Sequence, residues 1–140
     1  MTVEEYLHTP FDGPDRDVRN LAKTLGIRVL IEIRIQLSAS RFRVADIGVW
    51  HAGPIGQRIP TVPPFLVVEI LSPEDRLVRL PPKIREYLDH GVECVWVIDP
   101  DERSALSYSV GDPGGTLVDE LRTQNPDITI PLADLLSALD

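Results

Sequence analysis

FLVVEILSPEDR, residues 65–76, holds Glu69 inside a run that is otherwise apolar up to Leu71. A segment with apolar residues on both faces is typical of a central strand that is covered on both sides. A charge that is buried alone in such a strand costs several kcal/mol unless it is paired or binds a metal ion. The stretch therefore predicts an interior strand with a polar site at Glu69.

A second carboxylate, Asp46, stands in the middle of residues 42–50, which also have the composition of a strand. The two strands follow one another in the chain, so they could lie side by side and bring Asp46 and Glu69 within reach of one cation. Mg²⁺ and Mn²⁺ prefer oxygen ligands, carboxylates in particular. The pair thus predicts a divalent metal site, and the alternative is a buried salt bridge with Arg34 or Arg43.

The remaining elements are assigned from their periodicity. Apolar residues recur at every second position of residues 27–37, which predicts a strand with one buried face. Pro81 and Pro82 suit the first turn of a helix that ends near His90, where Gly91 stops it. The other expected elements are helices at residues 15–26 and 132–139, strands at 92–99, near 106–110 and near 128–132, and a turn at 112–115. This order predicts an α/β fold with a mixed sheet at its centre.

The formal net charge of −8 argues against a general attraction to nucleic acid, but the charge is unevenly distributed. Basic side chains outnumber acidic ones over residues 16–43, and acidic ones dominate after residue 99. This distribution is compatible with a polyanion held on one face, or simply with a solvated surface. The single cysteine, Cys94, excludes an internal disulfide framework and a cysteine-rich zinc site.

The length of 140 residues predicts one domain with a real hydrophobic core. No apolar run has the length that a membrane span needs. The first residues are acidic where a secretory signal would be basic, so we expect a cytoplasmic protein without membrane contact.

Several stretches together resemble a known family. The order of a helix, a strand, an Asp strand, a Glu strand, a helix and a strand resembles the core of the PD-(D/E)xK nuclease superfamily. More closely, the chain is similar to the Uma-type restriction endonuclease family through MTVEEYL, RFRVADIGV, PPFLVVEILSPEDR, KIREYLDHGVECVWVIDP and LRTQNPDITIPL. The resemblance implies a restriction-endonuclease-like core, with a central mixed β-sheet flanked by helices. It also implies DNA as the partner and Mg²⁺ (or Mn²⁺) as the cofactor.

By this resemblance, Asp46 and Glu69 are the metal-binding acids and part of the catalytic set. The superfamily usually places a lysine two positions after the glutamate, and in this sequence that position is Leu71. Lys83, on the following helix, is the natural replacement as the catalytic lysine. The alternative is that Lys83 is a solvated lysine on the outer face of its helix.

Glu32 lies on the polar side of the first strand by alternation, so the plain interpretation is a solvent-facing or cross-strand paired acid. The functional interpretation is a further acid that lines the cleft. Basic residues near the two acidic strands are the candidates for nucleic-acid contact: Arg34, Arg41, Arg43 and Arg76.

Members of the family usually place a strand hairpin and a longer helix between the EEYL segment and the strand at residues 27–37. Only residues 8–24 stand there in this chain. The resemblance therefore implies a single nuclease-like domain over residues 1–140 that is shortened at its N-terminal end. Such a domain could cover the missing surface by forming a homodimer.

Three functions follow as hypotheses. The first is a metal-dependent endonuclease that hydrolyses DNA phosphodiester bonds. The second is a catalytically weak or inactive nuclease-like module that binds DNA or protein, suggested by the short front end and by Leu71. The third is an acidic, dimeric scaffold without a nucleic-acid role, suggested by the net charge of −8.

Overall fold

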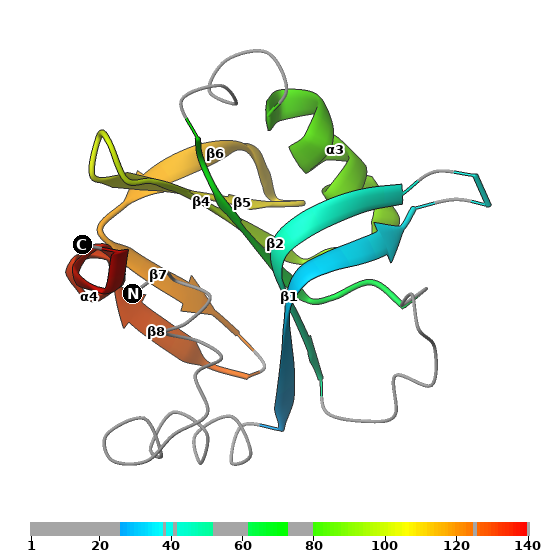
Figure 1. Cartoon of the computed structure of the whole chain (residues 1–140), viewed down its shortest axis with the longest axis horizontal. Helices are drawn as coiled ribbons and strands as arrows, with labels where there is room; N and C mark the ends of the chain where they lie inside the picture. Colours follow the sequence, from blue (N-terminus) through cyan, green and yellow to red (C-terminus); the bar gives the residue numbers. More distant parts are fainter. Residues whose placement is uncertain are drawn as a thin grey trace.

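The computed structural model describes residues 26–37, 39–40, 42–51, 62–72, 80–124 and 126–139. Within these residues a six-stranded sheet runs in the order β1-β2-β3-β4-β5-β6, and β7 pairs with β8 in a separate sheet (Figure 1). The elements are β1 (Ile27–Gln36), β2 (Phe42–His51), β3 (Leu66–Ile70), α3 (Leu80–His90), β4 (Cys94–Asp99), β5 (Ser104–Ser109), β6 (Asp112–Val118), β7 (Glu120–Thr123), β8 (Ile128–Pro131) and α4 (Leu132–Leu139).

The central sheet is mixed. β3 and β4 run parallel, and the other neighbouring strands pair antiparallel. A parallel pair needs a crossover connection, which here contains α3. The predicted α/β architecture, with a mixed sheet at its centre and helices against it, is confirmed.

Two apolar layers lie on opposite faces of this sheet. α3 packs on one face over Val67, Val95 and Val97, through its buried side chains Ile84 and Leu88. The opposite face carries Ile47, Val68, Trp96 and Ile98, which pack against residues of β7, β8 and α4. β3 and β4 are thus covered on both sides, as the apolar run around Glu69 predicts. We call the two layers the α3 layer and the α4 layer.

β1 contributes to both layers, because its alternation is interrupted at Glu32. Ile27 and Val29 pack against the α4 layer, whereas Ile33 and Ile35 belong to the α3 layer. Glu32 has a φ of 46°, a left-handed conformation that is uncommon for residues other than glycine. This conformation turns the following side chains to the other face. The prediction of a single buried face for this strand is therefore wrong, although the strand itself is confirmed.

β2 changes face opposite the same point. The register pairs Ile31 with Ile47 and Ile33 with Ala45, so Glu32 stands opposite Asp46. Ile47 belongs to the α4 layer and Ala45 to the α3 layer. Asp46 thus lies where the hairpin β1-β2 crosses from one layer to the other.

α3 ends in a hydrogen-bonded cap that fixes its last turn. Gly91 N–H donates to the carbonyl of Leu88 at 3.1 Å, and Val92 N–H donates to the carbonyl of Tyr87 at 3.0 Å. Gly91 has a φ of 109°, which this type of cap requires and glycine adopts without strain. The predicted helix and its stop at Gly91 are confirmed.

The turn predicted at residues 112–115 is wrong. Asp112 already pairs with Ser109, so the chain reverses at Val110 and Gly111, and residues 112–118 form β6. β6 is the last strand in the sheet order, where a proline is tolerated because the missing N–H faces no further strand. Gly115 is needed there because a Cβ would meet the ring of Tyr108 at 2.5 Å.

Other predicted elements agree closely with the structure. The strands at residues 92–99, 106–110 and 128–132 correspond to β4, β5 and β8, and the final helix is α4. The helix predicted at residues 15–26 lies almost wholly outside the described residues. Among the residues that the structure describes, no helix is long and apolar enough to cross a membrane.

Candidate active site

Glu69 lies on β3, in the middle of the α3 layer. The residue is 5% exposed, and its neighbours Val67 and Val97 are fully buried apolar residues. Its position in the strand is set by the parallel register, which pairs Glu69 with Val97 on β4. A carboxylate at this place is isolated from bulk water, so its protein partners decide its charge and its orientation.

Asp46 stands across from Glu69 on the neighbouring strand. The antiparallel register pairs Ile47 with Val68, and the next position along each strand brings Asp46 and Glu69 opposite one another. The Asp46 Oδ2 atom accepts a hydrogen bond of 2.7 Å from the backbone N–H of Ile70. One carboxylate oxygen therefore anchors Asp46 to β3. The predicted meeting of the two acids on adjacent strands is what the structure shows.

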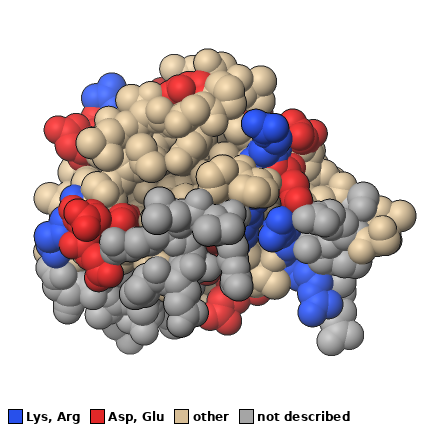
Figure 2. All heavy atoms as spheres, turned by 90° about the horizontal axis from the view of Figure 1, so that it is seen from above, with Lys and Arg blue, Asp and Glu red and all other residues tan. Residues whose placement is uncertain are grey.

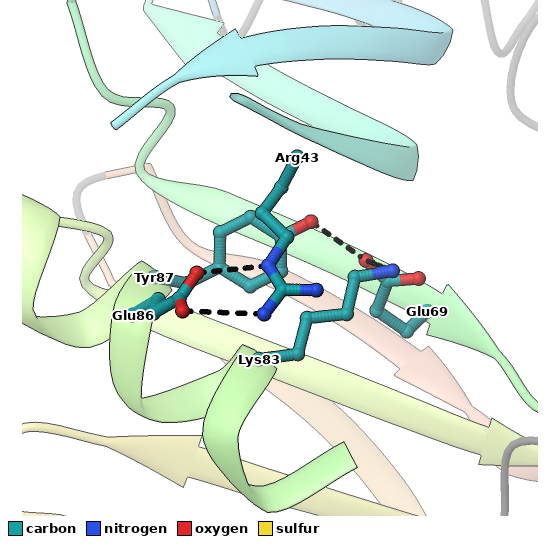
Figure 3. Close-up of polar contacts among 5 residues, drawn as sticks. All are labelled: Arg43, Glu69, Lys83, Glu86 and Tyr87. Atoms are coloured by element: carbon teal, nitrogen blue, oxygen red, sulfur yellow. Dashed lines mark hydrogen bonds and ion pairs between the residues drawn. The ribbon is translucent and has the colours of Figure 1, made fainter. Parts of the chain in front are cut away.

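Lys83 and Tyr87 reach Glu69 from α3. The Lys83 Nζ atom lies 3.2 Å from the Glu69 Oε1 atom, and the Tyr87 hydroxyl donates to the same Oε1 at 3.0 Å (Figure 3). Residues four positions apart lie on the same side of a helix, which explains why both side chains point to one carboxylate. Lys83 is thus turned toward the sheet, and its interpretation as a lysine of the outer helix face is wrong.

The environment of Glu69 raises its pKa to about 7. Burial is the largest cause, and the nearby Asp46 carboxylate adds to it by repulsion. Lys83 and the Tyr87 hydroxyl act in the opposite direction, because both stabilise the ionised carboxylate. Glu69 is therefore close to half-ionised at neutral pH without a further positive charge beside it. A perturbed carboxylate with a specific partner is typical of a functional site.

A second ion pair ties α3 to β2 beside this group. The Arg43 Nε atom donates to Glu86 Oε2 at 2.8 Å, and Arg43 Nη2 donates to Glu86 Oε1 at 3.2 Å. The hydrogen bond with Glu86 raises the pKa of Arg43. The alternative in which Arg43 pairs with Asp46 or Glu69 is therefore not what the structure shows. Arg43 holds the helix that carries Lys83 and Tyr87 against the strand that carries Asp46.

Of the other predicted site residues, Arg34 is directed away from this carboxylate pair, Glu32 stands opposite Asp46, and two arginines lie outside the described residues. Arg34 is exposed and points to the face opposite α3, because its neighbours Ile33 and Ile35 point into the α3 layer. Glu32 is exposed beside Asp46, at the crossing point of β1. Arg41 and Arg76 fall outside the described residues.

Leu71 stands two positions after Glu69, where the superfamily resemblance predicts a lysine, and in this chain its side chain is used for packing. It is partly buried against the α3 layer, and its N–H donates to the carbonyl of Ile98 at 2.9 Å. The positive charge beside Glu69 comes instead from α3.

Tyr87 and Glu86 are the participants that sequence reasoning missed. Tyr87 lies on the buried face of α3 together with Ile84 and Leu88, and it is fully buried. The spacing of four residues from Lys83 was the available signal that its hydroxyl would share the target of the lysine. No comparable signal connects Glu86 with Arg43, because the two residues are far apart in sequence.

The face of the molecule seen in Figure 2 carries blue and red side chains next to one another, rather than in separate areas. The uneven distribution of charge along the sequence is thus not matched by a separation of charge over the described residues of this face. Attraction of a polyanion to this face would depend on individual contacts.

The donor set of the site fits a hard divalent cation. Asp46 and Glu69 offer carboxylate oxygens from adjacent strands, the ligand type that Mg²⁺ and Mn²⁺ prefer. Asp46 Oδ1 and Glu69 Oε2 have no hydrogen-bond partner among the residues described by the structure. No group of three or more His, Cys, Asp or Glu residues with metal-binding geometry exists among those residues, so water and substrate oxygens would complete the coordination.

The model of the Uma2 family, described as "Putative restriction endonuclease", matches residues 16–139. The chain belongs to the Uma2 family. No curated protein matches the sequence. A solved structure from Anabaena variabilis, a "putative nuclease belonging to DUF820", is similar to this chain with a TM-score of 0.70 and 23% identity. The similarity covers 87% of this chain and 75% of that one, and at this identity it shows a shared fold.

Family membership and the shared fold confirm the resemblance stated from the sequence. The site assignment, the cofactor and the homodimer are separate questions, and they stay predictions.

Proposed function

We propose that this Uma2 protein is a metal-dependent endonuclease that hydrolyses DNA phosphodiester bonds. The observation that carries the proposal is the geometry around Glu69. Asp46 faces Glu69 across two adjacent strands, and Lys83 contacts it from α3 at 3.2 Å. Family membership supports the same reaction class.

Asp46 and Glu69 would hold Mg²⁺ or Mn²⁺ between β2 and β3. Such an ion, when bound, polarises a phosphoryl oxygen and makes a bound water more acidic. The protein supplies two fixed carboxylates for it, one anchored to the Ile70 N–H and one anchored to α3. Their mutual repulsion, which raises the pKa of Glu69, is the kind that a divalent cation relieves.

Lys83 has two tasks in this proposal. Its ammonium favours the ionised form of Glu69, which is the form that binds a cation. Its side chain is also 24% exposed, and an ammonium has more donors than one carboxylate oxygen uses. The remaining N–H groups can donate to a water or to a phosphate oxygen. As the water oxygen bonds to phosphorus and the bond to a bridging oxygen breaks, these donors stabilise the charge that develops.

Cleavage of supercoiled plasmid DNA tests the proposal. The parent protein is expected to nick or linearise the plasmid with Mg²⁺ or Mn²⁺ and to stop when the ion is chelated. Glu69→Gln and Asp46→Asn are expected to abolish cleavage, and Lys83→Gln to slow it by roughly a hundredfold or more. Each variant is compared at equal folded concentration, determined by circular dichroism.

Arg85→Gln is the matched control for Lys83→Gln. Arg85 is a basic residue of the same helix with an exposed side chain. The control is expected to cleave like the parent. The mechanism is wrong if the parent cleaves no DNA with either ion, or if Glu69→Gln cleaves as well as the parent.

A second function, a nuclease-like module that binds DNA without cleaving it, has one observation in its favour. Two of the predicted DNA contacts are not directed to the carboxylate pair, because Arg43 binds Glu86 and Arg34 points to the opposite face. DNA binding that weakens steeply with salt but is independent of divalent ions and of Glu69 would support this module. Cation-dependent cleavage would exclude it.

A further inference from the structure

One oxygen of Glu69 receives both contacts from α3. Tyr87 and Lys83 both contact Oε1, and Figure 3 shows the two side chains converging on the Glu69 carboxylate from α3. Two donors on a single oxygen define the rotation of a carboxylate about its terminal bond. The position of Oε2 is therefore a consequence of what holds Oε1.

The two donors differ in how rigidly each can fix the position of Glu69 Oε1. Tyr87 is fully buried, and its ring packs in the α3 layer with Val67 and Val95. The cap at Gly91 also fixes its backbone, because the carbonyl of Tyr87 accepts the N–H of Val92 at 3.0 Å. The Lys83 side chain is flexible and 24% exposed, and other anions can attract its ammonium group. The rigid donor to Oε1 is the phenol.

A phenol at this place is not explained by packing alone. The α3 layer is otherwise built from aliphatic and aromatic side chains, and a phenylalanine would fill the same volume without a buried hydroxyl. The hydroxyl has one described partner, the Glu69 carboxylate, at 3.0 Å. Buried hydroxyls that contact a metal-binding carboxylate orient it and tune its affinity.

We propose that Tyr87 is a positioning residue that holds Oε1 of Glu69 against α3, so that Oε2 is presented to a divalent cation beside Asp46. This inference rests on the proposed function, because it gives a role to Glu69 as a metal ligand. Tyr87 does not touch the cation or the DNA. It acts through the carboxylate, and Lys83 remains free to exchange between Glu69 and a phosphate oxygen.

Binding of Mn²⁺ to the DNA-free protein, measured by titration calorimetry and by electron paramagnetic resonance, tests the inference. Tyr87→Phe keeps the ring and removes only the hydroxyl. The apparent Kd for Mn²⁺ is expected to rise by roughly ten- to a hundredfold, which is the usual effect of losing a group that orients a metal ligand. The measurement is made at a temperature where both proteins are fully folded, so a loss of stability does not enter the result.

Tyr108→Phe is the matched control. Tyr108 is a half-buried tyrosine on β5 that packs against the same α3 layer, and its ring covers Gly115 rather than Glu69. Its variant is expected to bind Mn²⁺ like the parent. Plasmid cleavage by Tyr87→Phe is expected to approach the parent rate as Mn²⁺ is raised, because the defect lies in occupancy of the site.

The outcomes separate this inference from the proposed function. If the parent binds Mn²⁺ through Glu69 but Tyr87→Phe binds it with the parent affinity, the positioning role is overturned and the nuclease proposal stands. If the parent itself shows no Mn²⁺ binding that depends on Glu69, both are overturned. A rise in Kd for Tyr87→Phe with an unchanged Kd for Tyr108→Phe supports both.

Discussion

Val68 and Glu69 follow one another on β3 and point to opposite faces of the same sheet. Val68 meets Trp96, Ile98 and other apolar side chains of the α4 layer, whereas Glu69 meets a lysine and a phenol from α3. Both residues are almost fully buried. The α4 layer can be explained by burial of apolar surface alone, since that is what stabilises a core. The charged group in the α3 layer needs another explanation, and binding of a cation supplies one.

Three predictions test this difference between the layers. The largest effect is expected in the α4 layer, where Trp96 is 1% exposed. Trp96→Ala is expected to lower the free energy of unfolding by about 3–5 kcal/mol, because it leaves a cavity in a packed core. Chemical denaturation followed by circular dichroism measures the loss. A loss below about 1 kcal/mol would show that this layer is not the stabilising one.

The second prediction concerns the pH dependence of stability in metal-free buffer. The pKa of Glu69 is raised from 4.5 to about 7 in the folded protein, so ionisation of this group opposes folding. Its contribution to stability is therefore complete below about pH 4.5 and is lost as the pH rises to about 7. The loss amounts to roughly 3 kcal/mol at most, from the size of the shift.

Glu69→Gln removes this titration. The free energy of unfolding of the variant is therefore expected to increase relative to that of the parent as the pH rises from 5 to 8. Glu93→Gln, which changes an exposed carboxylate immediately before β4, is the matched control and should follow the parent. Parallel pH profiles for parent and Glu69→Gln would contradict the burial of an ionisable group at this position. Added Mg²⁺ is expected to reduce this difference in the free energy of unfolding, because it stabilises the folded parent with Glu69 ionised.

The smallest effect is expected for the ion pair between Arg43 and Glu86. Both side chains are about one quarter exposed, so water screens their attraction even though the contact is bidentate. Arg43→Met and Glu86→Gln, combined in a double-mutant cycle, are expected to give a coupling of about 1 kcal/mol or less. A coupling of several kcal/mol would show that polar contacts at the α3 layer also stabilise the fold. The two layers would then differ less in what holds them together.

Much of the fold could be predicted because local patterns and tertiary packing agree. The run around Glu69 predicts a strand covered on both faces, and Pro81, Pro82 and Gly91 bound α3 correctly. The meeting of Asp46 with Glu69 follows from two consecutive strands that pair. The sequence leaves two alternatives for Lys83, and the structure has the one in which its side chain is turned toward Glu69, while its catalytic role stays a proposal.

The remaining features depend on contacts that no local pattern contains. Glu32 adopts a left-handed conformation, and the apolar side chains before and after it pack in different layers, whereas strict alternation predicts that they share one face. The glycines of residues 112–115 suggest a turn, yet one of them makes room for the Tyr108 ring in a strand. Tyr87 belongs to the apolar face of its helix, so the sequence does not indicate a partner for its hydroxyl. The partner, Glu69, comes from a different element and follows only from the three-dimensional structure.

The crossing of β1 and β2 at Glu32 and Asp46 has a consequence for how the molecule unfolds. The same hairpin contributes side chains to both layers, so neither layer can be lost while the hairpin stays paired and intact. Opening events that expose the core should therefore be shared: amides of β1 and β2 on both sides of the crossing are expected to exchange with solvent with a common free energy. A strand that changes face in this way joins the α3 layer and the α4 layer into one cooperative unit. Asp46 lies at the position where the hairpin passes from one layer to the other.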